Sequence, residues 1–277
     1  MKSNKLLLVG FALIATNSWS QFWKTSDPVK LEGTINSLAE ESMPIFSKDS
    51  SILYFVRTFD KENKGDENDQ DIWMSSKDST GGYVDAKVIK ELNNKFNNAV
   101  LSINPKGDHL YVLNSYEGKK DMEKGIAMSE LKDGTWSEPV KLQIPGLDID
   151  GDFYSFHVNS SENVIIISYQ GPNTMGLEDL YVVTKNGNSW SAPEHMGSDI
   201  NSTGFEMSPF LSRNSDTLFF SSNGFGGEGD ADIFYSVKKG SWTSWTAPIN
   251  VGNKINSPLF DAYFVHSGIQ AYWSSNK

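Results

Sequence analysis

The chain has 277 residues, a net charge of −11 and no cysteine. Hydrophobic residues make up 38% of the chain and charged residues 21%, which is the composition of a globular protein and not of a disordered one. The lack of cysteine excludes disulfide scaffolds, iron–sulfur sites, cysteine nucleophiles and lipidation at cysteine. The acidic balance, with a pI near 4.8, argues against a nucleic-acid partner, because phosphates require a basic surface.

The first twenty residues have the pattern of a secretory signal peptide. A short basic segment, Met1–Lys5, precedes the apolar run Leu6–Ala15, and Ser18 and Ser20 supply small residues before a cleavage point at Gln21. The run is too short to span a bilayer, which needs about 20 apolar residues. We therefore expect a signal peptide over residues 1–20 and an exported domain over 21–277, with no membrane span. A buried N-terminal helix is the alternative interpretation of the same segment.

The rest of the chain consists of five repeats. Each repeat opens with an acidic or polar residue, at Glu41, Asn98, Asp152, Glu206 and Asp261. The intervals between these openers are 57, 54, 54 and 55 residues, so the period is near 55. A sustained period of this length indicates a repeat architecture.

Each repeat is predicted to form four short β-strands. After a first strand that follows the opener, the most apolar run gives the second strand, at Ile52–Val56, Leu110–Leu113, Val164–Ile167, Leu218–Phe220 and Ala271–Trp273. The third strand starts at Asp71, Gly125, Asp179 and Asp232. The fourth strand starts near a W-x-x-P phrase at Trp136, Trp190 and Trp245, with a degenerate version at Tyr83–Ala86 in the first repeat, and proline favours an edge position. The only helical signal is a possible turn near Lys90–Asn97.

Four strands per repeat predict an all-β protein, a β-propeller of five blades of about 55 residues. The fifth repeat has only two strands, and the segment Trp23–Leu31 resembles Trp136–Leu142. We expect this N-terminal strand to join the C-terminal blade and to close the ring. No third strand is found for that blade, so three strands are expected there. Six blades or an open ring are the alternatives.

The phrases E-x-S-P-F, D-x-L-F-F-S-S-N, G-G-x-G-x-x-D-I-F and W-x-x-P, which are clearest in residues 201–252, resemble the WD40-like β-propeller repeat. This repeat occurs in TolB-like proteins and in outer-membrane proteins with an OmpA-type tail. The resemblance implies a propeller of a Gram-negative cell envelope. We expect this chain to be such a propeller without an OmpA-type C-terminal domain.

The acidic openers Glu41, Asp152, Glu206 and Asp261 are candidates for a ring at one mouth of the central channel. Four carboxylates there can bind a cation such as Ca²⁺ or perform the paired-carboxylate chemistry of glycosidases. The structural interpretation, in which each carboxylate accepts hydrogen bonds from backbone N–H groups of the neighbouring blade, is favoured because the repeat carries such an acid whatever the activity. The aspartates at the starts of the third strands are also interpreted as structural.

Other candidate sites are weaker. The loop Asp60–Asp71 has only Asp60 and Gly65 in common with an EF-hand, and Lys64 occupies a ligand position, so Ca²⁺ has little support. His157 and His266 occupy repeat positions that are apolar in other blades, which indicates packing and not metal binding. No nucleotide-binding glycine motif or serine-nucleophile elbow is present. No catalytic or metal site is therefore predicted. Phe225 and Trp242 are candidate interface aromatics, with packing between blades as the alternative.

Together these features predict an exported, non-catalytic propeller that mediates protein–protein interaction in the periplasm or at the periplasmic face of the outer membrane. The expected partner is an envelope protein such as an outer-membrane or secretion component. The acidity predicts a basic patch on the partner and salt-sensitive association. The alternatives are a glycan-acting hydrolase and a small-ligand binder that use an acidic channel. A plugged channel with an apolar patch favours the protein-binding function, and an open mouth with two carboxylates and an aromatic favours the hydrolase or the ligand binder.

Overall fold

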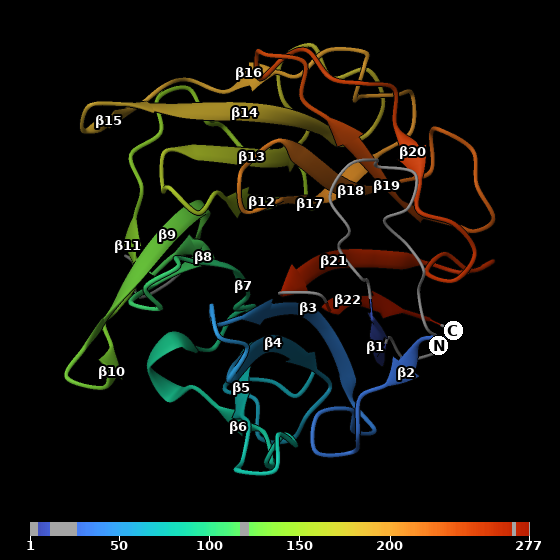
Figure 1. The fold of residues 1–277 in the computed structure, drawn as a ribbon. Coiled ribbons are helices and arrows are strands. Elements are labelled where there is room, and N and C mark those ends of the chain that lie inside the picture. The colour runs from blue at the N-terminus through green and yellow to red at the C-terminus, as the bar shows by residue number, and fades with distance from the viewer. Residues whose placement is uncertain (1–4, 12–26, 117–121, 268–269, 277) are drawn as a thin grey trace.

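The computed structural model describes residues 5–11, 27–116, 122–267 and 270–276 of the chain. In these ranges the structure consists of β-strands and one short 3₁₀ helix, η2 (Lys90–Leu92), at the predicted turn. No helix there is long and apolar enough to cross a membrane. The sheets are arranged as a β-propeller, which confirms the predicted fold class (Figure 1).

The described residues form five antiparallel sheets, and four of them are each built from one continuous stretch of chain. The first contains β3 (Glu40–Phe46), β4 (Ile52–Thr58), β5 (Gln70–Ser76) and β6 (Lys87–Val88). The second contains β7 (Val100–Ile103), β8 (His109–Ser115), β9 (Glu123–Lys132), β10 (Thr135–Trp136) and β11 (Val140–Lys141). The third contains β12 (Ser155–Val158), β13 (Val164–Tyr169), β14 (Asp179–Asn186), β15 (Ser189–Trp190) and β16 (Glu194–His195). The fourth contains β17 (Glu206–Leu211), β18 (Thr217–Ser222), β19 (Asp232–Val237) and β20 (Ile249–Asn250).

The fifth sheet joins the two ends of the chain, in the order β21 (Asp261–Ser267), β22 (Gln270–Ser275), β1 (Lys5–Phe11) and β2 (Val29–Lys30). The strand β2 belongs to the N-terminal segment that was expected to complete the C-terminal blade. The expected number of three strands is wrong, because Lys5–Phe11 forms a further strand between β22 and β2. This segment is thus a strand and not the helix of the alternative interpretation. Trp23 lies outside the described residues.

The innermost strands of the five sheets contact one another in a closed circuit. β3 contacts β7, β7 contacts β12, β12 contacts β17, β17 contacts β21, and β21 contacts β3. Each sheet contributes one strand to this circuit, so the sheets surround one axis (Figure 1). The ends of these five strands define two opposite faces where a ligand can approach the axis.

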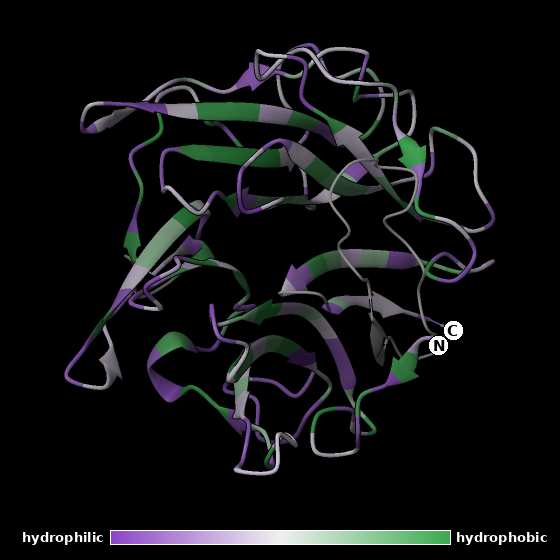
Figure 2. Ribbon diagram, in the orientation of Figure 1, coloured by the Kyte–Doolittle hydropathy of each residue, from purple (hydrophilic) through white to green (hydrophobic). Residues whose placement is uncertain are grey.

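The middle strands are buried on both sides by neighbouring sheets. All six residues of β13 and all six of β18 are buried. β-Branched and aromatic residues dominate these strands because such side chains pack well on a pleated surface. Figure 2 shows the long hydrophobic stretches of β13 and β14. Phe220 of β18 lies in the same apolar cluster as Ile166 of β13, so the core is a series of layers between blades.

The outer edge of a blade is interrupted at the proline of the W-x-x-P phrase. Pro139 separates β10 from β11, and Pro193 separates β15 from β16. Proline has no N–H group to donate to a neighbouring strand, so the outer strand is split into two short pieces. In the fourth sheet the first piece is reduced to one bridge between Lys238 and Trp245.

Three inner strands bulge two residues after the opener. Their registers shift between Ser42 and Ile45, between Met207 and Phe210, and between Ala262 and Val265. At each bulge one non-glycine residue has a positive φ, namely Met43 at 53°, Ser208 at 53° and Tyr263 at 58°. Such backbone costs of order 1 kcal/mol or more per residue, and a bulge re-aims the side chains near it. Here Met43 and Tyr263 line a hollow at one end of the ring.

Candidate functional site

Three of the four predicted acids are buried and hold the loop before their own strand. Ser202 donates to Glu206 through its backbone N–H at 2.9 Å and its hydroxyl at 2.5 Å, and Ser222 donates at 2.7 Å. Burial raises the pKa of Glu206, and the hydroxyl and amide donors oppose this effect. The same contact between residues four apart joins Ser257 to Asp261 and Ser37 to Glu41. These donors therefore come from the acid's own loop and, for Ser222, from the next strand of its own blade, and not from the neighbouring blade.

Glu41 differs from the other two because a buried cation lies beside it. Arg57 Nε is 3.1 Å from Glu41 Oε1, and the two side chains are 7% and 0% exposed. The guanidinium also donates to the carbonyl of Ile35 at 2.8 Å and lies 4.2 Å from the ring centroid of Trp73. Arg57 thereby connects the first blade to the loop that follows β2.

Asp152, the fourth predicted acid, lies elsewhere. Its side chain is 93% exposed and lies 3.8 Å from Lys124 Nζ. Glu206 pairs with Ser222 of the second strand, and Ser222 in turn faces Asp232 of the third strand. In the third blade Tyr169 faces Asp179, and extending the pairing of β12 with β13 by one residue puts Tyr154 opposite Tyr169, in the place of Glu206. The Tyr154 hydroxyl bonds to Asn114 at 2.6 Å.

A second recurring contact, made by asparagines, was missed by the sequence analysis. Asn93, Asn201 and Asn256 each bond to both the N–H and the C=O of one third-strand residue, with distances of 2.7 to 3.0 Å. The residues so held are Ile72, Leu180 and Ile233. For Asn201 and Asn256 the signal was the phrase Ile-Asn-Ser at 200–202 and 255–257, whereas Asn93 lies in the different phrase Leu-Asn-Asn at 92–94. At 200–202 and 255–257 the asparagine holds one blade and the serine holds the opener of the next, so the phrase joins two blades.

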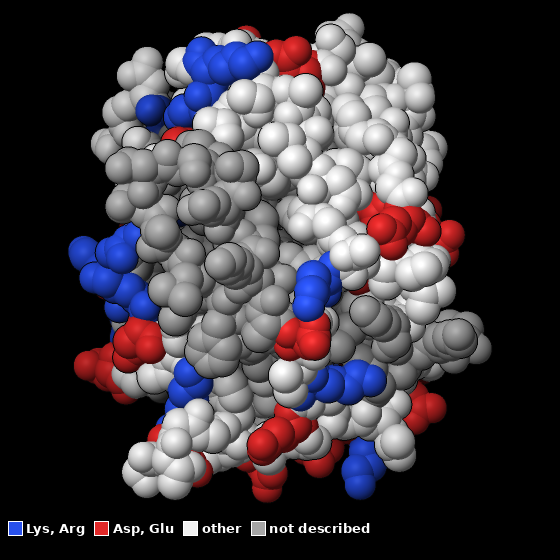
Figure 3. Space-filling model, turned by 45° about the vertical axis from the view of Figure 1, so that its right-hand side comes forward, with Lys and Arg blue, Asp and Glu red and all other residues white. Residues whose placement is uncertain are grey.

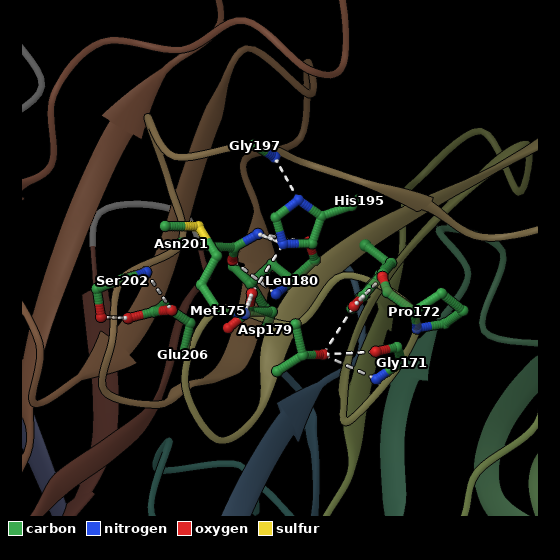
Figure 4. A network of polar contacts seen from close by, with 12 residues as sticks. Gly171, Pro172, Met175, Asp179, Leu180, His195, Gly197, Asn201, Ser202 and Glu206 are labelled. Carbon is green, nitrogen blue, oxygen red and sulfur yellow. Dashed lines mark hydrogen bonds and ion pairs between the residues drawn. The ribbon is translucent and has the colours of Figure 1, made fainter.

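Figure 4 shows the most extended of these junctions, around Asp179 and His195. His195 Nδ1 accepts the N–H of Gly197 at 3.2 Å, so the ring proton lies on Nε2, which is 2.8 Å from Asp179 Oδ2. Asp179 also accepts the N–H of Met175 at 2.7 Å, and Asn201 Nδ2 lies 3.0 Å from His195 Nε2. Asp179 is fully buried. The network fixes the outer strand and the following loop against β14, which is a structural role.

The larger hollow lies where the inner strands begin and has a volume of about 1290 Å³. Its lining includes four apolar side chains at the surface: Phe153, which is 70% exposed, Leu177, which is 52% exposed, Phe205 and Phe260. The rings of Phe205 and Phe260 have centroids 6.4 Å apart. Charged residues of both signs complete it: Asp69, Lys95, Lys124, Asp150, Asp152 and Glu178. Asp152 is the only one of the four predicted acids in this lining.

The axis of the ring is filled below this hollow. A narrow cavity of about 20 Å³ is lined by apolar residues of the inner strands, including Leu101, Phe156 and Phe264. A second hollow of about 350 Å³ opens on the far side. There the Phe210 ring lies between the rings of His157 and His266, at centroid distances of 4.8 and 5.2 Å. Burial lowers the pKa of His157 to about 3, so this histidine is a neutral packing residue.

The two predicted interface aromatics do not line either hollow. Phe225 lies against Phe220 and Phe234 at centroid distances of 6.1 and 5.7 Å. The ring centroids of Trp242 and Trp245 are 6.3 Å apart, and Lys238 Nζ lies 3.6 Å from the Trp242 centroid. Both side chains are partly buried against the core cluster of the third and fourth blades.

The acidic loop Asp60–Asp71 uses its carboxylates locally. Asp60 accepts the N–H of Glu62 at 2.9 Å, and Asp71 accepts the N–H of Lys64 at 2.7 Å. The Lys64 ammonium donates to the carbonyl of Asn93 at 2.8 Å. In the described part of the chain no three His, Asp or Glu side chains are grouped so as to hold a metal ion.

Comparison with known proteins supports the fold. The chain matches no protein-family model and no curated protein sequence. The structure of TolB from Acinetobacter baumannii is similar with a TM-score of 0.54 and 12% identity, over 98% of this chain and 63% of TolB. A chain of a nidogen/laminin complex has a TM-score of 0.51 and 10% identity, over 98% of this chain and 85% of that one. A thermostable family-43 glycoside hydrolase has a TM-score of 0.49 and 13% identity, over 88% and 91%. The likenesses to TolB and to the nidogen/laminin chain show the β-propeller fold alone.

Proposed function

We propose that this chain is an exported, non-catalytic β-propeller that binds a protein partner in a bacterial cell envelope through the larger hollow. The observation that carries the proposal is the plugged axis beneath a wide hollow with exposed apolar side chains. Interfaces place aromatic and apolar anchors at their centre and polar residues at their rim. Phe153, Leu177, Phe205 and Phe260 supply such a centre, and the lysines and carboxylates around them supply the rim.

The signal-like N-terminus supports a cell-envelope setting for this proposal, and the similarity to TolB is compatible with it. We place the protein in the periplasm or at the periplasmic face of the outer membrane, with an outer-membrane or secretion component as its partner. On the side seen in Figure 3, Lys and Arg side chains are interspersed with Asp and Glu. The net charge of −11 nevertheless favours a partner with a basic surface and an association that weakens in salt.

The first test is affinity purification of the tagged full chain from detergent-solubilised envelopes, followed by identification of the co-purifying protein. We expect Phe153→Ser and Leu177→Ser each to weaken that association at least about tenfold, because buried aromatic and apolar anchors dominate interface energies. Both side chains are mostly exposed, so the unfolding free energy should change by less than about 0.5 kcal/mol.

Val140→Ser is the matched control for this test. Val140 is 59% exposed and lies on the outer strand β11, away from both hollows. It should leave the association unchanged. Recovery of the propeller alone under mild crosslinking would reject the proposed function. Equal losses in the Val140 variant and the hollow variants would reject the hollow as the binding surface.

One observation favours a glycan-acting hydrolase as the second candidate. Burial raises the pKa of Glu178, and this residue lines the hollow with Asp152 and several aromatic rings. A raised carboxyl pKa suits a general acid, and the pair would need to be about 5 to 9.5 Å apart. If this candidate is correct, the protein cleaves a glycan in a substrate screen, and Glu178→Gln lowers the rate at least about a hundredfold without loss of folding. Glu206→Gln is the less informative variant, because Glu206 is fully buried.

A further inference from the structure

The third-strand position of the closing blade is filled by the extreme N-terminus of the chain. β1 pairs antiparallel with β22, with Lys5 opposite Ser275, Leu7 opposite Trp273 and Leu8 opposite Tyr272. On its other side β1 pairs with β2 through Leu7 and Leu8. The outer strand β2 thus joins the sheet through β1.

This position conflicts with the predicted export. The residues of β1 lie within the basic and apolar parts of the predicted signal peptide, and cleavage before Gln21 would remove them. The processed chain would keep β21, β22 and β2 but would lack the strand between β22 and β2. The edge of a strand without a neighbour is a template for pairing with another chain.

The other blades show what this position requires of its occupant. The third strands β14 and β19 each begin with five consecutive buried residues, and β5 has Asp71–Trp73 buried. A third strand therefore needs a run of apolar side chains, because both of its faces are covered. Leu6–Val9 is such a run. The first residues of the processed chain, Gln21–Ser26, have only two adjacent apolar side chains, Phe22 and Trp23.

We propose that in the processed chain this position receives an apolar β-strand of the envelope partner, antiparallel to β22 and next to β2. The proposal rests on the proposed export and partner binding, and it adds the mode of recognition. Main-chain hydrogen bonds to β22 supply affinity, and a run of at least four apolar residues supplies specificity. The signal peptide occupies the position only until it is removed.

The test uses the full-length chain, expressed with export and isolated from the envelope, whose N-terminus is then sequenced. Amide hydrogen exchange is compared between β22 and β18, the equivalent strand of the fourth blade, which has partners on both sides. We expect processing before Gln21 and exchange in β22 at least about tenfold faster than in β18. A synthetic peptide with the sequence of residues Lys2–Phe11 should slow the exchange of β22 at least about tenfold.

The matched control is the same peptide with Leu7→Pro, which removes an N–H group from the middle of the strand and should abolish the protection. A chain that retains residues 1–20 would overturn both the export and the docking proposal. A processed chain in which β22 is already as protected as β18 would overturn the docking proposal alone, because its own residues then fill the position. A peptide that has no effect, or a proline variant that acts equally well, would also overturn the docking proposal.

Discussion

Replacing Arg57 by leucine is expected to lower the free energy of unfolding by about 3–5 kcal/mol. The substitution leaves the fully buried Glu41 carboxylate without the guanidinium that lies 3.1 Å from it. It also removes the donor to the Ile35 carbonyl and the cation over the Trp73 ring. Urea unfolding, followed by tryptophan fluorescence, measures this loss.

A second variant separates the buried charge from the lost packing. Glu41→Gln in the Arg57→Leu background removes the buried negative charge and keeps an acceptor for Ser37, so the double variant should regain about half of the lost stability. A loss of less than about 1 kcal/mol in Arg57→Leu would mean that water reaches the carboxylate and that the ion pair does not hold the blade junction. If the double variant is no more stable than Arg57→Leu alone, the loss of stability comes from packing and not from the buried charge.

The repeat period carried most of the fold information. Openers spaced by about 55 residues and apolar second strands were sufficient to predict an all-β propeller closed by the N-terminal segment, because strand patterns are local. The third strand of the closing blade, β1, was missed for a physical reason. Leu6–Val9 satisfies both the pattern of a signal peptide and the apolar run of a doubly covered strand, and the sequence alone does not distinguish the two.

The roles of the acids depended on register and burial, which the sequence does not give. Glu206 and Asp261 were placed correctly at the start of an inner strand, yet their carboxylates bond to a serine four residues earlier and do not line the hollow. Asp152 was aligned two residues away from Tyr154, which holds the equivalent place. Phe153, the most exposed aromatic of the hollow, stands one residue before Tyr154, just as Phe205 and Phe260 stand before Glu206 and Asp261. This repeat signal was missed because the third repeat was aligned on Asp152.

These assignments separate the residues that hold the ring from those that we propose to face a partner. The asparagine and serine contacts at Asn201 and Ser202 lie between blades and use side chains that are almost fully buried. Apart from Lys124 of β9, the exposed charged and apolar groups of the hollow lie on loops before the inner strands or between the second and third strands. Variation of these loops alters binding without touching the contacts between blades. The ring can therefore be kept while its loops change.

Asp71→Asn is expected to stabilise the protein by about 1–2 kcal/mol at pH 7.5. Burial raises the pKa of the Asp71 carboxyl from 3.8 to about 6, with the nearby Asp69 charge adding to the effect and the Lys64 N–H at 2.7 Å opposing it. A native carboxyl with this pKa loses about 3 kcal/mol of stability once it is ionised, and asparagine regains only part of this because its amide must also be buried. Asparagine keeps an acceptor for the Lys64 N–H and carries no charge.

The pH dependence of this gain gives the sharper test. Because the native carboxyl holds its proton to higher pH than the unfolded one, its protonation stabilises the native state below pH 3.8, and this stabilisation is lost as pH rises through about 6. The difference between Asp71→Asn and the parent chain should therefore be smallest near pH 3.8 and should reach a plateau above pH 6.5. Asp66→Asn is the control of opposite sign, since the Asn68 donors lower the pKa of Asp66. A constant difference for Asp71→Asn across this range would show that the buried charge is not the cause.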